Sequence, residues 1–198
     1  DSVYTKVEAQ SKRSLTEEQM NTLLHTDFEK LPEDVQNVPA YFLLMFLFRG
    51  MPFIDMAYLR KQDLKEHCIT YCRHKTGKKM VVRIPHEATA LFEKCRNKKT
   101  DSGYLFPILD ETTENDKKLY ENYRQALRTF NRKLAKMAAL LLPGTNISSY
   151  TARHTWATLA FYSGIPIGII SKALGHSSIK VTETYLKPFE NEKVDAAN

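Results

Sequence analysis

Apolar side chains recur every three or four residues along positions 117–141, the longest periodic segment of the chain. This period matches one face of an α-helix, so the segment predicts a long amphipathic helix. The recurring positions are Leu119, Tyr123, Ala126, Leu127, Phe130, Leu134, Met137 and Leu141.

Two other apolar segments predict helices in the first half of the chain. Positions 39–49 are apolar on almost every face, which predicts a helix buried at the centre of the domain and ended by Gly50. Ser14 and Glu17 have the spacing of a capping box, so we expect a helix from there to about His25. Its buried face would carry Leu15, Met20, Leu23 and Leu24.

Alternation of apolar and polar residues predicts a β-hairpin with strands at 67–71 and 80–84. The turn between the strands, 74–79, contains a glycine and is basic, and Pro85 ends the second strand. A brief strand is expected at 104–107, and short helices at 51–59, 87–96, 166–174 and 178–186. Ser148 or Ser149 is expected to cap a further helix that carries Arg153. The fold class is therefore mainly α with a small antiparallel β-sheet.

Composition narrows the class of protein without specifying the fold. The 198 residues fit one domain with a core of its own. A net charge of +6 suits a polyanionic partner, although a basic protein without a special partner has the same charge. The three cysteines form no zinc pattern, and the longest apolar run, 41–48, is too short to span a bilayer. We therefore expect no zinc site and no membrane span. Because the chain starts with no signal peptide, we also expect a cytoplasmic location.

Three residues in the last quarter of the chain suggest chemistry at a phosphodiester. Arg153 lies near the start of a predicted helix, His176 follows Gly175, and Tyr185 comes nine residues after His176. A guanidinium can hold two phosphate oxygens, an imidazole can support them or exchange a proton, and a phenol can act as the nucleophile. Each residue alone is also compatible with a structural role, so their order and spacing carry the argument.

The motifs around these residues resemble those of a known family. Arg153-His154-Thr-Trp-Ala-Thr, then Leu174-Gly175-His176, then Tyr185 resemble the catalytic half of a tyrosine recombinase of the phage integrase family. The resemblance is greatest to integrases of Bacteroides-type mobile elements, and it covers roughly residues 12–187. It implies the tyrosine recombinase catalytic-domain fold and a site-specific recombinase that works through a covalent 3′-phosphotyrosine intermediate. Its partner would be double-stranded DNA, bound by a homotetramer on two duplexes, with a monomer expected for the chain alone. The resemblance implies no metal and no cofactor.

The resemblance also suggests further site residues. Lys75, in the hairpin turn, matches the lysine that protonates the leaving 5′ oxygen, with Lys78 and Lys79 as competing candidates. Tyr150 stands where the family usually has a histidine, and we expect it to support the site. His154 is expected to point elsewhere and to form a buried structural hydrogen bond.

One position of the family pattern is missing. Pro52 occupies the place of the family's first arginine, and Arg49 is the candidate to replace it from a shifted backbone position. Asp55 matches an acidic residue that orients an arginine. The departures at positions 52 and 150 leave open an inactive relative that only binds DNA.

The domain organisation is expected to have three parts: a linker at 1–12 from an upstream core-binding domain, a catalytic domain at 13–187 and a tail at 188–198. Basic residues on the long helix form either a solvated face or contacts to DNA phosphates. A helix-turn-helix regulator is an alternative, because segment 164–182 has the pattern of helix, turn and recognition helix. Such a regulator would not need Arg153, Lys75 and Tyr185 together.

Overall fold

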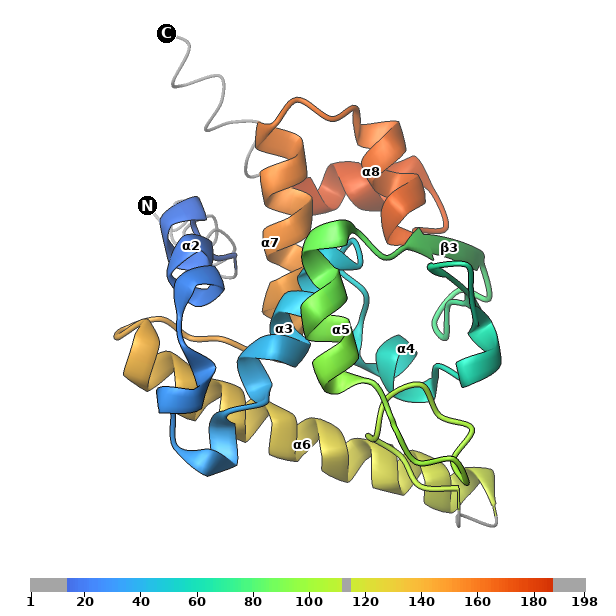
Figure 1. Ribbon diagram of the computed structural model, residues 1–198. Helices are drawn as coiled ribbons and strands as arrows, with labels where there is room; N and C mark the ends of the chain where they lie inside the picture. The colour runs from blue at the N-terminus through green and yellow to red at the C-terminus, as the bar shows by residue number, and fades with distance from the viewer. Residues whose placement is uncertain (1–13, 112–114, 187–198) are drawn as a thin grey trace, which may run out of the picture.

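The computed structural model describes residues 14–111 and 115–186 (Figure 1). The predicted linker at 1–12 and tail at 188–198 lie outside the described residues. The α-helices are α2 (Glu17–His25), α3 (Val38–Leu47), α4 (Phe53–Tyr58), α5 (Thr89–Cys95), α6 (Asp116–Leu141), α7 (Ser149–Tyr162) and α8 (Ile167–Leu174). Residues 179–186 are also helical. Short 3-10 helices lie at Phe28–Lys30, Glu33–Val35, Lys61–Asp63 and His86–Ala88.

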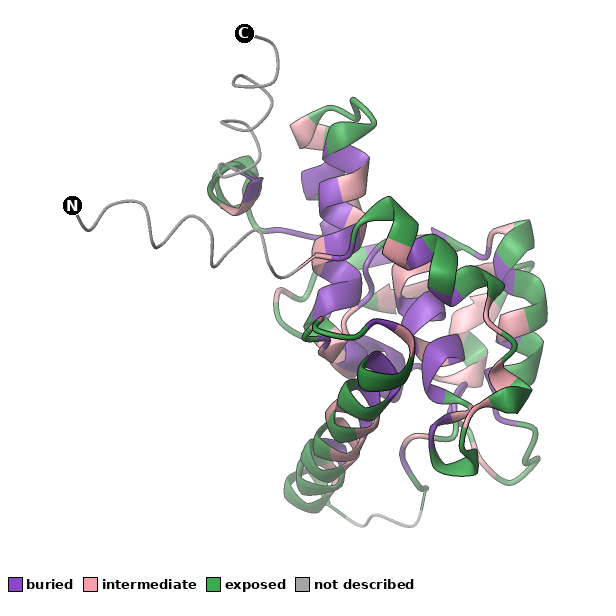
Figure 2. Ribbon diagram, turned by 90° about the vertical axis from the view of Figure 1, so that its left-hand side faces the viewer, coloured by how far each residue is buried: buried purple, intermediate pink, exposed green. Residues whose placement is uncertain are grey.

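The predicted central helix is the core of the molecule. α3 packs against α5, α6 and α7, and Phe42, Leu43, Leu44 and Met45 are fully buried on it. α6 runs along one side of the molecule, and α7 crosses its centre and leads to α8 (Figure 1). Buried residues concentrate on α3 and α7, whereas much of α6 is exposed (Figure 2). The prediction of a mainly α fold with a small antiparallel sheet is therefore confirmed.

The sheet has three antiparallel strands in the order β1 (Leu64–Lys65), β2 (Cys68–Cys72) and β3 (Lys79–Arg83). Cys68 pairs with Arg83 and Cys72 with Lys79, which confirms the predicted hairpin. Its turn therefore lies at one end of the sheet, and His67 and Ile84 lie at the other.

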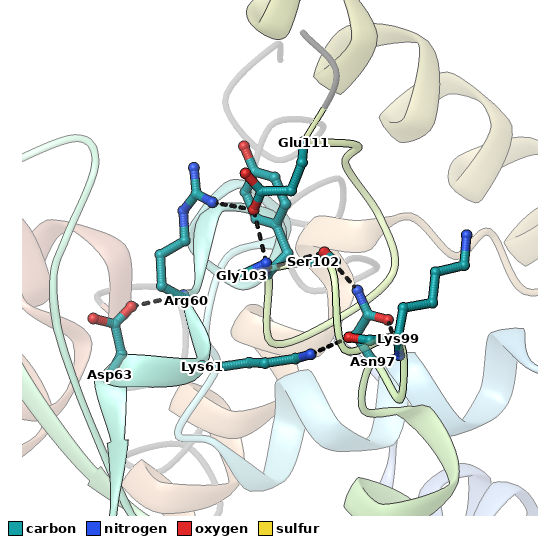
Figure 3. Close-up of polar contacts among 9 residues, drawn as sticks. Arg60, Lys61, Asp63, Asn97, Lys99, Ser102, Gly103 and Glu111 are labelled. Carbon is teal, nitrogen blue, oxygen red and sulfur yellow. Dashed lines mark hydrogen bonds and ion pairs between the residues drawn. The ribbon is translucent and has the colours of Figure 1, made fainter.

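The strand predicted at 104–107 was wrong, because the structure has only an isolated bridge between Arg60 and Tyr104 there. The Arg60 guanidinium lies 3.8 Å above the Tyr104 ring, and its Nη1 donates to Glu111 at 2.5 Å. Glu111 also accepts from the Gly103 backbone amide (Figure 3). These side-chain contacts organise the loop, so it needs no strand ladder.

The start of α2 also differs from the prediction. The capping box is formed by Thr16 and Gln19, two residues later than the predicted pair Ser14 and Glu17. The physical reason lies in Leu15, which is buried and whose backbone amide donates to the Thr155 hydroxyl of α7 at 2.9 Å. This contact keeps residue 15 outside the helix, just before its N-cap residue Thr16. In this register Met20 and Leu23 face the core, whereas Leu24, predicted to be buried, is 46% exposed.

Candidate active site

Arg153 is held by carbonyl oxygens from two distant segments, the turn after α3 and the end of α8. Ser148 and Thr151 form a capping box at the start of α7, as one of the two predicted caps. One turn further on, the Arg153 side chain is 2% exposed. Its Nη1 donates to the Gly50 carbonyl at 3.0 Å, and its Nη2 donates to the Leu174 carbonyl at 2.6 Å. The guanidinium therefore has a fixed place and direction.

Gly50 allows the end of α3 to approach α7 closely. Its φ of +67° favours glycine, and a Cβ at this position would lie 2.9 Å from the Cα of Arg153. A side chain would thus push apart the two backbone segments that hold the guanidinium.

His176 enters the site from the loop after α8. Gly175 ends that helix in the left-handed conformation, with a φ of +64°. The buried His176 imidazole forms a hydrogen bond of 2.7 Å between its Nδ1 and the Thr182 hydroxyl. Burial and then the nearby positive charge of Arg153 lower the pKa of His176 to about 4. The imidazole is therefore neutral at neutral pH.

Tyr185 lies against the same group. Its ring stacks on that of His154, with centroids 4.5 Å apart and an angle of 10° between the planes. The ring of His176 lies 6.1 Å away at 61°. The Tyr185 hydroxyl oxygen is buried, and the phenol is close enough to Arg153 to affect the pKa of its guanidinium. The structure thus brings together Arg153, His176 and Tyr185.

The structure shows where the His154 ring lies. As expected, it points elsewhere than Arg153, and its ring stacks on that of Tyr185, the proposed nucleophile. The sequence pattern places neighbouring helix residues on different faces, and it does not say which face Tyr185 would reach.

The hairpin turn docks onto the loop that carries His176. The Thr76 hydroxyl donates to the Gly175 carbonyl at 3.2 Å, and the Lys78 ammonium donates to the His176 carbonyl. Lys75 is exposed on the same turn, and its charge is among those that lower the pKa of His176. Lys75 thus lies at the edge of the site, whereas Lys78 already holds the loop.

Arg73 is a member of the site that the sequence analysis missed. Its side chain is buried, and its Nη1 donates to the Gly175 carbonyl at 2.8 Å. Its Nε lies 4.0 Å from Oδ2 of Asp55, whose Oδ1 accepts from the His74 backbone amide at 2.8 Å. The arginine that Asp55 orients is therefore Arg73. An arginine just after a strand gives no sequence signal of burial, so only its spacing of two residues from Lys75 could have drawn attention to it.

The site carries more buried positive than negative charge. Burial and then the charge of Arg73 lower the pKa of Arg153 to about 10. Burial also raises the pKa of the Asp55 carboxyl, which disfavours its charged form. Among the hydrogen bonds that the described residues make, none involves Nε of Arg73 or Nε of Arg153. Two buried guanidinium groups with spare donors form a site suited to an anion with several oxygen acceptors.

Two of the residues singled out in the sequence lie at or beyond the rim. Tyr150, on the first turn of α7, is 49% exposed, and its ring lies edge-on to that of His154 at 4.9 Å. Arg49 is exposed and lines a surface pocket with Arg83 and His67, at the end of the hairpin opposite the turn. The next residue, Gly50, binds Arg153 through its carbonyl, whereas Arg49 lines this separate pocket.

The described residues, with positions 1–13, 112–114 and 187–198 set aside, include no group of three or more potential metal ligands. None of their helices is both long enough and apolar enough to cross a membrane.

Comparison with known proteins places this geometry in a family. The model of the phage integrase family matches residues 13–192. A tyrosine recombinase of Pseudothermotoga lettingae is 29% identical over 183 residues, which cover 89% of this chain and 59% of that protein. The chain thus spans less than two thirds of the length of this relative.

Solved structures support the same fold. The crystal structure of XerA recombinase has a TM-score of 0.62 at 19% identity, over 93% of this chain and 65% of that one. XerH recombinase bound to its difH substrate has a TM-score of 0.60 at 17% identity, over 87% of this chain and 50% of that one. Likeness at this identity shows the fold alone, whereas the family match covers nearly the whole chain. The chain belongs to the phage integrase family.

Proposed function

We propose that this chain is the catalytic part of a site-specific DNA recombinase that cleaves and rejoins strands in the integration or excision of a mobile element. One observation carries the proposal: the buried guanidinium groups of Arg73 and Arg153 converge beside the rings of His176 and Tyr185. The two guanidinium groups can bind a phosphate, and the phenol beside them can attack it. A mechanism with a covalent phosphotyrosine intermediate needs both kinds of group.

The proposed cleavage step exchanges one phosphate ester for another. The phenol oxygen of Tyr185 attacks the scissile phosphorus, and the bond from phosphorus to the 5′ oxygen breaks. The phenol proton passes to His176, whose pKa rises from its low value in the DNA-free chain once the negative phosphate lies beside it. The ammonium of Lys75 gives its proton to the leaving 5′ oxygen. Religation reverses these transfers, so strand exchange consumes no ATP.

We assign the phosphate clamp to Arg153 and Arg73. Both side chains are buried and donate to backbone carbonyls, Arg153 to two and Arg73 to one. Nε of Arg153 makes no hydrogen bond within the described residues, and Nε of Arg73 lies 4.0 Å from the Asp55 carboxylate, which orients it. Arg73 supplies the second cation in place of the arginine missing at Pro52, and it does so from the hairpin turn that also carries Lys75. Tyr150 supports the rim of the site through its contact with His154.

The substrate and assembly follow from the same proposal. XerH, which shares the fold, binds a DNA substrate, and we propose double-stranded DNA as the partner of this chain. Four copies would act on two duplexes, with residues 13–187 as the catalytic domain and an upstream domain helping to hold the DNA. The motif Arg153-His154-Thr-Trp-Ala-Thr supports a place among integrases of Bacteroides-type mobile elements, and such a protein would act in the cytoplasm.

Covalent trapping tests the proposed activity. The full-length protein is incubated with duplex DNA from the flanks of its own element, nicked just beyond the cleavage point so that the cut fragment diffuses away. Denaturing gels should show protein attached to a 3′ end for the wild type and for Tyr120→Phe, a change at an exposed tyrosine of α6, but not for Tyr185→Phe. An adduct that persists in Tyr185→Phe, or specific DNA binding without any adduct in the wild type, would exclude Tyr185 as the nucleophile.

A further inference from the structure

Three aromatic rings lie in a row across the mouth of the site. The ring of Tyr150 meets that of His154 edge-on at 4.9 Å, and the other neighbour of His154 is Tyr185, stacked at 4.5 Å with nearly parallel planes. Tyr150 and His154 are four residues apart on α7, so they share one face of the helix. The row thus runs from the rim of the site inward to the proposed nucleophile.

The residues on either side of Tyr185 hold the backbone of this segment in place. Leu186 is fully buried in a small cluster with residues of α7 and α8, and the Thr182 hydroxyl bonds His176 at 2.7 Å. These contacts fix where the segment 179–186 lies. The Tyr185 side chain also packs against this cluster, and the ring that lies parallel to its own is that of His154.

α7 therefore holds two parts of the site with adjacent residues. Arg153 points inward to the carbonyls of Gly50 and Leu174, while His154, about 100° further around the helix, lies flat against Tyr185. Because both side chains belong to one turn of a rigid helix, the distance between the phosphate clamp and the phenol is set by that turn. Positioning of this kind matters because small displacements of a reacting group reduce the rate strongly.

We propose that His154 is a positioning residue that holds the Tyr185 ring by stacking, with its phenol directed at the phosphate site of its own chain. This inference rests on the proposed function. In this role the flat face of the imidazole matters, and its titratable nitrogens do not take part in the reaction. A different flat ring at position 154 should therefore serve in its place, whereas a methyl group should not.

The first test measures the position of the ring without DNA cleavage. Full-length wild type, His154→Ala and His154→Phe are treated with tetranitromethane, and nitration of each tyrosine is followed by peptide mass spectrometry. Tyr185, whose hydroxyl oxygen is buried, should be nitrated slowly in the wild type and in His154→Phe, and about tenfold faster in His154→Ala. Tyr120 is 50% exposed and serves as the internal standard in all three proteins. Equal nitration of Tyr185 in all three would overturn the proposal.

The second test separates stacking from proton transfer. The rate of adduct formation on nicked DNA is measured for the same three proteins at saturating DNA, from pH 6 to pH 9. His154→Ala should react about tenfold more slowly with unchanged DNA affinity, and His154→Phe should recover most of the lost rate with the pH profile of the wild type. If the phenylalanine variant is as slow as the alanine variant, or shifts the profile, His154 acts through its nitrogens and the proposal is wrong.

The two tests also separate this proposal from the proposed function. If the wild type forms no adduct, the recombinase proposal fails, and the nitration rates alone then decide whether His154 holds Tyr185. If the adduct forms at Tyr185 and His154→Ala forms it as fast as the wild type, the recombinase proposal stands. The proposed positioning role of His154 is then wrong. Thermal melting of each variant shows whether a lower rate results from unfolding. His154→Phe is the control for packing, because it keeps the side-chain volume that His154→Ala removes.

Discussion

Arg73 and Arg153 donate to consecutive carbonyl oxygens at the C-terminal end of α8. Arg153 Nη2 binds the Leu174 oxygen at 2.6 Å, and Arg73 Nη1 binds the Gly175 oxygen at 2.8 Å. One arginine comes from α7 and the other from the end of β2, so the loop before His176 fixes the two cations relative to each other. In the proposed function this buried pair holds the phosphate, although position 52 is a proline.

The first prediction concerns the role of Arg73. Arg73→Gln should reduce the rate of adduct formation by about 10²- to 10³-fold, because it removes one of two charged donors to the phosphate in a water-poor site. Arg49→Gln, at an exposed position on a separate pocket, should change the rate by only a few-fold. Both rates are measured on nicked DNA at saturating concentration, with folding checked by circular dichroism. Loss of activity in Arg49→Gln with normal activity in Arg73→Gln would reverse the assignment.

The second prediction concerns the close approach of Gly50 to α7. Gly50→Ala adds a Cβ at 2.9 Å from the Cα of Arg153 and places alanine at a φ of +67°. Gly144→Ala has similar backbone strain, with a φ of +79°, but its Cβ meets nothing within 4 Å. Gly144→Ala should cost about 1–2 kcal/mol of unfolding free energy, and Gly50→Ala should cost more and also slow adduct formation. Chemical unfolding checks both values, and equal costs would contradict the packing argument.

The third prediction concerns the pH dependence of stability. His176 has a pKa of about 4 in the folded chain against an ordinary value of 6.5, so the unfolded chain binds more protons between these values. Its contribution to stability is thus present above pH 6.5 and is lost as the pH falls towards 4. Urea unfolding of the wild type and His176→Gln at pH 7 and pH 5 measures it. The free energy of unfolding should fall more on acidification for the wild type, and parallel changes in both proteins would show that His176 does not carry this dependence.

The fourth prediction distinguishes Lys75 from Lys78. Lys75→Ala should slow cleavage of ordinary DNA strongly, because the leaving 5′ oxygen then lacks its proton donor. DNA with a sulfur in place of that oxygen should restore the rate, since a thiolate leaves without protonation. Lys78→Ala removes the ammonium that holds the His176 carbonyl, so its defect should remain with the sulfur substrate. Rescue of Lys78→Ala and not of Lys75→Ala would exchange the two roles.

Much of the fold could be predicted because its signals are local. The period of the apolar residues defined α6, and the apolar run defined the central position of α3. Alternation defined the hairpin, in which Cys68 pairs with Arg83 and Cys72 with Lys79. The segment that resembled a helix-turn-helix forms α8 and the start of the following helix, and the loop between them holds His176.

The features that could not be predicted depend on contacts between distant residues. Burial of Arg73 depends on Asp55 and the Gly175 carbonyl, which lie on other elements. The start of α2 depends on a hydrogen bond to Thr155 from a residue 140 positions earlier. The stack of His154 on Tyr185 forms because the chain after α8 packs back against α7, and no periodic pattern in the sequence predicts that packing.

The most direct test of the central claim is to identify the amino acid that becomes attached to DNA. The trapped complex is digested with nuclease and protease, and the peptides are sequenced by mass spectrometry. The proposed mechanism predicts one modified peptide, which carries a nucleotide linked through its 3′ phosphate to the phenol oxygen of Tyr185. A nucleotide on any other residue, or a link through a 5′ phosphate, would contradict it.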